Sequence, residues 1–184
     1  CQVIRYGHGR ILGLQADALL WSVPYRVGLM HDDNVLGLRG ATLLEPVGEG
    51  GEGAGWYLAD EKRTYWMAGA DPKDWNQVIK VPHAAVPGTS VVVPGDKLGL
   101  DTSALCAFWL GRNGTFYAGL PGGTVRPIRA SDLALPVDAE RGAVGYFEFE
   151  GIQQLFTTIL AGGANRAAMG DDAAATVRRN GVVI

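Results

Sequence analysis

Two segments of this sequence decide the expected fold, because each holds two aromatic runs separated by a polar turn. Residues 56–69 read WYLADEKRTYWMAG, and residues 107–119 read AFWLGRNGTFYAG. Short runs rich in Trp, Tyr, Phe and Thr on both sides of a turn are typical of β-hairpins, and Asn-Gly is a strong hairpin signal. We therefore expect two antiparallel hairpins, with turns at 59–63 and 111–114.

The two hairpin segments look like copies of one unit. Trp56 and Trp109 lie 53 positions apart, and Thr64 and Thr115 lie 51 positions apart. A weaker echo of run, turn and run spans residues 20–29. A period of about 40–50 residues with several strands per unit is typical of propeller blades, which stack because one blade cannot cover both of its own faces. We therefore expect an all-β fold of repeated antiparallel sheets, β-propeller-like, with aromatic rings between the blades.

Further strand-like runs surround these hairpins, bounded by Gly and Pro, at residues 3–12, 35–38, 42–47, 91–93 and 124–128. Residues 143–160 hold two more runs around Gly151, which indicates a closing hairpin. After Leu160 the composition becomes rich in Ala and Gly. We expect residues 1–160 to form the β-repeat domain and residues 161–184 a C-terminal arm, either extended or with a short helix from Asp171 to about Arg179.

The composition limits the class of protein. The 184 residues include 27 Gly and 9 Pro, 47% are hydrophobic and 19% are charged, which fits about one globular domain with many turns. The net charge of −3 argues against a domain that binds nucleic acid through phosphate contacts. No apolar run reaches the roughly 18–20 residues that a membrane span requires. We expect no nucleic-acid specificity and no membrane span.

The two cysteines, Cys1 and Cys106, are too few for a disulfide scaffold and too far apart for a zinc motif. An amino-terminal cysteine can act as a nucleophile with its own α-amino group as base, and Arg5 and Arg10 follow closely enough to stabilise charge. Cys1 could instead bear the lipid of a processed lipoprotein, or begin a trimmed or truncated chain. Cys106 precedes an aromatic run and is expected to be a buried apolar residue.

The other polar motifs are interpreted as turns and loops. His8, His31 and His83 share no metal-ligand spacing, and the stretch 31–33, His-Asp-Asp, is expected to be a solvated loop. The stretch 71–74, Asp-Pro-Lys-Asp, has the chemistry of a turn and lacks the apolar setting that acid–base work needs. The glycine-rich stretch 48–55 lacks the Lys-Ser/Thr of a phosphate loop. We expect no catalytic, metal-binding or cofactor-binding residues and no cofactor.

Aromatic residues also raise the hypothesis of a platform for sugar rings. Trp75 lies in a polar stretch and is the candidate for an exposed ring, whereas the other four tryptophans lie in strand-like runs and are expected in the core: Trp21, Trp56, Trp66 and Trp109. Asn113-Gly114-Thr115 matches a glycosylation acceptor pattern, but a tight hairpin explains it better.

Several segments, taken in order, resemble a group of tail-associated virion proteins of tailed bacteriophages. The resemblance spans about residues 3–160 and is carried by Gly9–Leu12, Leu20–Tyr25, Gly28-Leu29, Arg63–Pro72, Ala85–Thr89, and Phe108–Gly114 through Gly119–Gly123. It implies a β-propeller-like domain built into the tail, with a structural role or a contact with the host or another tail protein. It supplies no catalytic residue.

At roughly 40–50 residues per blade the chain holds about four blades, fewer than full propellers usually have, so it is a small propeller, a fragment, or one completed by partner chains. The expected function is that of a non-enzymatic structural component of a phage tail, located in the virion. The expected partners are other tail proteins, further copies of this chain, and a host-surface glycan or receptor, contacted through loops 48–55, 59–63 and 70–76. The alternatives are an amino-terminal nucleophile hydrolase that uses Cys1 and a carbohydrate-binding propeller that uses Trp75.

Overall fold

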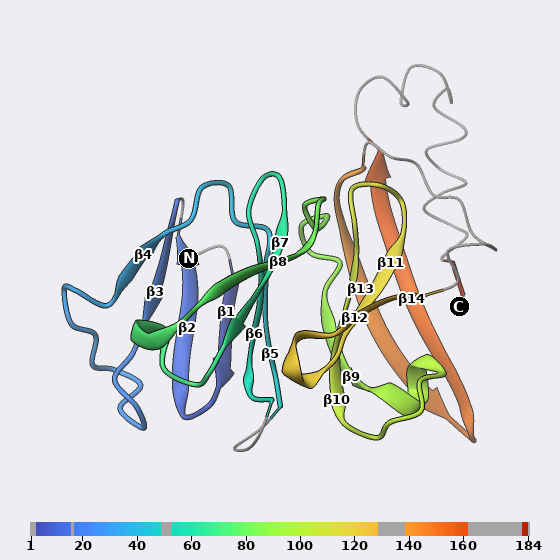
Figure 1. Cartoon of the computed structure of the whole chain (residues 1–184). Coiled ribbons are helices and arrows are strands. Elements are labelled where there is room, and N and C mark those ends of the chain that lie inside the picture. Colours follow the sequence, from blue (N-terminus) through green and yellow to red (C-terminus); the bar gives the residue numbers. More distant parts are fainter. Residues whose placement is uncertain (1–2, 16, 49–52, 129–138, 162–181, 184) are drawn as a thin grey trace.

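The chain folds into four antiparallel β-sheets that lie side by side in chain order (Figure 1). This computed structural model describes residues 3–15, 17–48, 53–128, 139–161 and 182–183. Within these residues the helical elements are three short 3₁₀ turns: η1 (Pro72–Asp74), η2 (Gly95–Leu98) and η3 (Pro121–Gly123). The prediction of an all-β chain made of antiparallel sheets is confirmed.

The first three sheets are four-stranded meanders, in which each strand pairs with the next one along the chain. The first sheet contains β1 (Val3–Gly7), β2 (Arg10–Gln15), β3 (Ala18–Trp21) and β4 (Val35–Gly37). The second contains β5 (Leu43–Val47), β6 (Gly55–Ala59), β7 (Thr64–Ala68) and β8 (Gln77–Val81). The third contains β9 (Val91–Pro94), β10 (Leu105–Leu110), β11 (Phe116–Gly119) and β12 (Val125–Ile128). The fourth contains β13 (Ala139–Phe149), β14 (Ile152–Ala161) and β15 (Val182–Val183).

Both hairpins that decide the fold are present, as β6–β7 and β10–β11. The turn between β10 and β11 is not the two-residue Asn-Gly turn, which needs a positive φ at both residues. Only Gly114 has a positive φ, of 80°, and the turn is longer. The Asn113 amide instead donates to the Tyr117 hydroxyl at 2.8 Å. Two-residue turns with both φ angles positive occur at His8-Gly9 and at Glu150-Gly151, where they match the twist of the flanking strands.

The echo expected over residues 20–29 is not a hairpin of the same kind. β3 ends at Trp21, and a loop with an isolated bridge between Val23 and Arg26 follows it. The second partner of β3 is β4, in the register Leu20↔Val35. Pro24 has no N–H to donate to a ladder, so a strand cannot run on through this position as part of the sheet interior.

Apolar side chains fill the space between each pair of neighbouring sheets. Successive residues of a strand point to opposite faces, so each inner sheet contributes to two layers. The Tyr57 ring, in the layer between the second and third sheets, lies 4.8 Å from the Trp66 ring and 5.3 Å from the Trp109 ring, measured between centroids. The expected core residues are all buried: Trp21, Trp56, Trp66, Trp109 and Cys106.

The two hairpins are equivalent, but Trp56 and Trp109, the pair that suggests the repeat, do not occupy equivalent positions in them. One step from the turn, Leu58 pairs with Tyr65 in the second sheet, and Trp109 pairs with Tyr117 in the third. The residue equivalent to Trp109 is therefore Leu58, 51 positions earlier, rather than Trp56. Leu58 and Trp109 both pack against the preceding sheet, so the two hairpins also share their orientation in the stack.

The first strands of neighbouring sheets contact each other. β1 contacts β5, β5 contacts β9, and β9 contacts β13. β4, β8 and β12 form the opposite edges of their sheets. The described sheets do not close into a propeller, because the first and fourth sheets lie at opposite ends of the row (Figure 1).

The predicted closing hairpin is present as β13–β14, a long antiparallel pair that turns at Glu150-Gly151. β15 extends this sheet by pairing Val182 and Val183 with the free edge of β14. Residues 162–181, on which the predicted helix from Asp171 to Arg179 falls, lie outside the described residues.

Asp60 holds the turn between β6 and β7. One carboxylate oxygen accepts hydrogen bonds from the N–H groups of Lys62 (2.7 Å) and Arg63 (2.6 Å), and the other accepts from the Tyr65 hydroxyl at 2.7 Å. Burial raises the pKa of Asp60, but the Tyr65 and backbone hydrogen bonds outweigh it, and the net pKa lies below the ordinary value of 3.8.

The lowered pKa predicts a pH dependence of stability. The contribution of the ionised Asp60 is present above its unfolded pKa of roughly 3.9 and is lost as the pH falls through the lower folded value. We expect Asp60→Asn to reduce the free energy of unfolding by about 1 kcal/mol at pH 7 and to make the loss of stability below about pH 4 shallower. Urea unfolding at a series of pH values measures both effects. Glu61→Gln, on the same turn, is the control, and an Asp60→Asn acid limb identical to wild type would contradict the prediction.

Candidate functional site

The outer face of the first sheet is apolar and exposed. Val3, Leu12 and Leu19 pack toward the second sheet, so strand alternation places their neighbours on the other face. Ile4, Gly13, Leu20 and Val35 are paired across the four strands in one row of this outer face. Three large side chains on it are strongly exposed: Ile4 at 56%, Tyr6 at 61% and Val35 at 47%.

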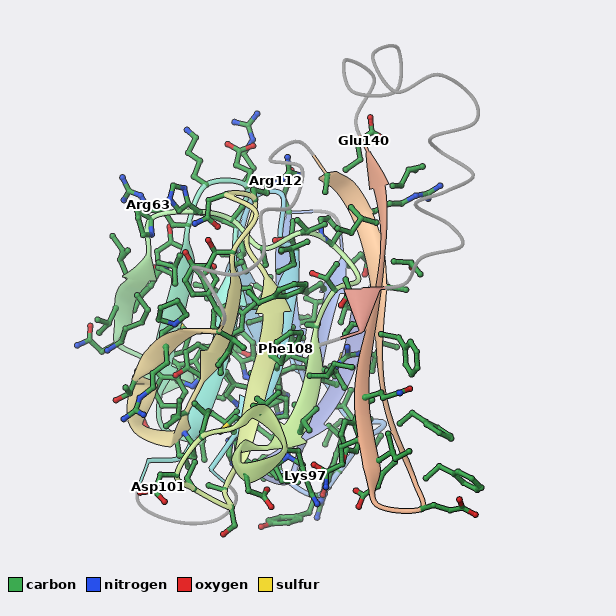
Figure 2. All side chains as sticks on the ribbon, turned by 90° about the vertical axis from the view of Figure 1, so that its right-hand side faces the viewer. Arg63, Lys97, Asp101, Phe108, Arg112 and Glu140 are labelled. Carbon is green, nitrogen blue, oxygen red and sulfur yellow. The ribbon has the colours of Figure 1, made fainter. Side chains whose placement is uncertain are left out.

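The outer face of the fourth sheet has the same character. Val144, Tyr146 and Leu155 pack toward the third sheet, so the residues between them face away. The exposed apolar side chains are Phe147 at 52%, Phe149 at 58%, Ile152 at 60% and Phe156 at 37%. The Phe147 and Phe149 rings stack with centroids 6.2 Å apart. Figure 2 shows side chains projecting from the β13–β14 hairpin on the side away from the other sheets.

The outer faces of the first and fourth sheets, called the end faces below, resemble the sheet faces that are buried between neighbouring sheets, but no described sheet covers them. At the buried interfaces, aromatic rings lie over glycines: a Cβ added at Gly119 would meet the Tyr57 ring at 2.4 Å, and one at Gly7 would meet the Trp56 ring at 3.0 Å. At Gly37 and Gly145, which lie on the two end faces, an added Cβ would meet nothing within 4 Å. At Gly37 and Gly145 the end faces therefore leave open the space that rings fill elsewhere in the stack, whereas Gly13, in the outer row of the first sheet, is buried.

A buried carboxylate joins the first strands of three sheets. Glu45 on β5, whose side chain is 2% exposed, accepts hydrogen bonds from Arg5 of β1 at 2.8–3.0 Å and from the Ser90 hydroxyl, just before β9, at 2.6 Å. The hydrogen bond to Glu45 raises the pKa of Arg5, although burial lowers it. These three residues line a cavity of about 410 Å³ beside the first strands. These hydrogen bonds let Glu45 hold the first strands of the three sheets together.

A second, more open groove of about 730 Å³ lies across the loops at one end of the stack. Small residues of the second sheet and its loops line it together with Gly122 of η3, and its aromatic members are His8, Tyr25 and Trp66. Tyr25 is 83% exposed and has a φ of 57°, a strained backbone conformation for a bulky residue. Its ring lies over Gly9, where an added Cβ would come within 2.8 Å of the ring. The fold thus presents one rigidly placed, solvent-facing phenol at this groove.

His8 forms the wall between the cavity and the groove, because it lines both. Its Nε2 lies 3.1 Å from the Gly55 carbonyl oxygen, so Nε2 carries the hydrogen and donates it. Its Nδ1 is buried and has no hydrogen-bond partner. The ring also meets Trp56 edge-on, with centroids 5.6 Å apart, so His8 is packed in place rather than free to turn.

Trp75 is half-buried instead of being the exposed ring that the sequence suggests. Its Nε1 donates to the Gly69 carbonyl oxygen at 3.1 Å, and its ring lies 6.4 Å from Trp56. Packing against the core of the first two sheets overrides the polarity of its neighbours. Tyr25, at 83%, is the most exposed of the aromatic rings that the sequence did not single out, and its position directly after Pro24 in a turn was the available signal.

The acidic motifs have structural partners or lie in solvent. Asp71 binds Arg10 at 2.6 Å and caps η1 through the N–H of Lys73, in agreement with the predicted turn. His31 is exposed on the β3–β4 loop, as predicted, and Asp33 there lies 3.6 Å from the Lys73 ammonium. Across the described residues, no three His, Cys, Asp or Glu side chains lie close enough together to hold a metal ion.

The structure does not test the Cys1 hypothesis, because Cys1 lies outside the described residues. Arg5 and Arg10, which that hypothesis places near Cys1, are paired with Glu45 and Asp71. Of the three expected contact loops, 48–55 and 70–76 contribute Gly53, Ala54 and Ala70 to the groove, although residues 49–52 are not described. Loop 59–63 lies at the opposite end of the sheets, where Figure 2 labels Arg63 and Arg112, with Lys97 and Asp101 at the groove end.

Comparisons with protein-family models, curated proteins and solved structures find no match to this chain. Among the described residues, no helix is both long and apolar enough to cross a bilayer.

The buried carboxylate gives a prediction about stability. Arg5→Met leaves Glu45 buried without its cation, and we expect this change to reduce the free energy of unfolding by about 3 kcal/mol. Replacing both residues, Arg5→Met with Glu45→Met, removes the uncompensated charge, so we expect the double variant to be more stable than Arg5→Met alone. Urea unfolding of the single and double variants measures the coupling. A double variant no more stable than Arg5→Met would show that the pair does not act through its charge.

Proposed function

We propose that this protein is a non-enzymatic structural component of a bacteriophage tail that acts through protein–protein contacts. The observation that carries the proposal is the pair of exposed apolar end faces, on the first and fourth sheets. Large exposed apolar patches mark interaction sites, because water solvates them poorly. The phenylalanines of the fourth sheet are residues of the kind enriched in protein interfaces. The assignment to a phage tail rests on the resemblance in the order of the sequence segments.

The sheet arrangement supports a propeller-like architecture within this proposal. Three successive meanders place their first strands side by side and their last strands at the opposite edges, which is how blades are arranged around a propeller axis. Blades at the ends of an incomplete series must be covered by something else, because each has an apolar face left over. A structural role in an assembly provides that cover.

A second candidate function is contact with a host-surface glycan at the groove. The strained, 83% exposed Tyr25 favours it, because a bulky residue in this backbone conformation holds its ring largely in solvent beside the groove. An aromatic ring above a floor of small residues can stack on the apolar face of a sugar. His8 and Trp66 line the same groove and would form part of its wall beside the bound sugar.

The structural proposal predicts that the chain is part of the particle. We expect mass spectrometry of purified virions of the encoding phage to map peptides from this chain at a fixed ratio to other tail proteins. Introducing Phe149→Asp should lower that ratio, because a charge on the fourth sheet's outer face opposes its burial. Ile79→Asp, on the outer edge of the second sheet at 50% exposure, is the control and should be incorporated normally. Virions that lack the chain would reject the proposal.

The glycan hypothesis predicts binding that depends on Tyr25. On a glycan array, we expect Tyr25→Ala to weaken binding by about tenfold, the scale of a lost ring contact. Tyr6→Ala removes a similarly exposed ring from the end face and should bind like wild type. If wild-type protein binds no glycan, or the two variants behave alike, the groove is not a sugar site.

A further inference from the structure

We infer that a second copy of this chain covers the exposed end faces, with the fourth sheet of one copy packed on the first sheet of the next. This inference rests on the proposed function, since it names the partner for the same surfaces. It also specifies the orientation: the copies associate head to tail, and two copies close a ring.

The direction of stacking inside one chain decides the orientation. We call the face of a sheet that points toward the next sheet in the chain its forward face, and the opposite face its backward face. Every buried interface joins the forward face of one sheet to the backward face of the sheet that follows it. Among the described residues, no sheet lies against the backward face of the first sheet or the forward face of the fourth. The two free faces are therefore of opposite kinds, and each is the kind that the other packs against elsewhere in the molecule.

The side chains on the two free faces match this role. The fourth sheet offers the Phe147 and Phe149 rings beside the uncovered Gly145, and the first sheet offers Ile4 and Tyr6 on the strand nearest the stack axis. Rings over glycines are the contact used inside the stack, as at Tyr57 over Gly119. A second copy would continue the same pattern of contact, whereas an unrelated partner would need to reproduce it.

The contacts between the first strands of successive sheets bear on whether a longer stack of sheets would close into a ring. The first strands β1, β5, β9 and β13 contact one another in succession, so we expect a continued series to turn about the line of these strands and curve back on itself. A head-to-tail interface with such a rotation closes into a ring. Two copies of four sheets give eight, which lies within the roughly four to eight blades of known propellers. The side chains of Arg5, Glu45 and Ser90 would then lie near the centre of the ring.

The test compares three matched aspartate variants by size-exclusion chromatography with light scattering. Ile4→Asp changes the first sheet's outer face, Phe147→Asp changes the fourth sheet's outer face, and Ile79→Asp is the control; these side chains are 56%, 52% and 50% exposed. We expect wild type and Ile79→Asp to have about twice the 19.5 kDa mass of one chain. Each face variant alone should be monomeric, with dissociation constants raised about 30-fold or more. Circular dichroism confirms that each variant is folded.

Mixing the two face variants distinguishes the orientations. In the mixture one interface joins two unaltered faces, so we expect Ile4→Asp and Phe147→Asp to form a mixed dimer that neither forms alone. If Phe147→Asp dimerises by itself, the first sheet pairs with its own copy, and if Ile4→Asp does so, the fourth sheet does. Either result overturns the head-to-tail inference. A wild-type ring of more than two copies would overturn closure by two.

The outcomes for this inference and for the proposed function are separable. Wild-type protein that is monomeric in solution yet present in virions would overturn the inference and leave the structural function standing. A head-to-tail dimer that is absent from virions would do the opposite.

Discussion

Each sheet of this protein is apolar on both faces, and this constraint governs the rest of the structure. A sheet of this kind is stable only when another layer covers each face, because exposed apolar surface is unfavourable in water. Stacking the sheets in chain order covers both faces of the second and third sheets. Their large aromatic side chains are fully buried, with 0% exposure at Trp56, Tyr57, Phe108 and Trp109. Among the described residues, nothing comparable covers the outer faces of the first and fourth sheets, and the proposed assembly rests on these two faces.

Glycines make the close stacking possible. Rings such as Tyr57 occupy space that a side chain at Gly119 would fill, so the large aromatic residues and the glycines act as complementary parts of one interface. This explains why a chain with 27 glycines still builds a well-packed interior. Substituting either partner would affect two sheets at once, since each contact crosses from one sheet to the next.

The charged interior has a different role from the apolar layers. Burying Glu45 is unfavourable unless its charge is compensated, and Arg5 and Ser90 supply the compensation from neighbouring sheets. These hydrogen bonds are directional, so they fix how the first strands align, which apolar packing alone would leave loose. The fixed alignment in turn places the loops that form the groove, and with them Tyr25. The proposed assembly surfaces and the groove therefore lie on different parts of the fold: the former on sheet faces, the latter on loop ends.

The amino-acid sequence by itself determined the all-β class, the two hairpins, the closing hairpin and the burial of four tryptophans, because these depend on local turn chemistry and on alternation within a strand. Only the tertiary structure decided which strand pairs with β3, why Trp75 packs inward while Tyr25 stands exposed, and that Leu58 is the counterpart of Trp109. It also brought Arg5, Glu45 and Ser90 together from positions up to 85 residues apart. Those features depend on contacts between segments that are distant in the sequence. The local pattern of residues in one strand does not indicate which distant residues will pack against it.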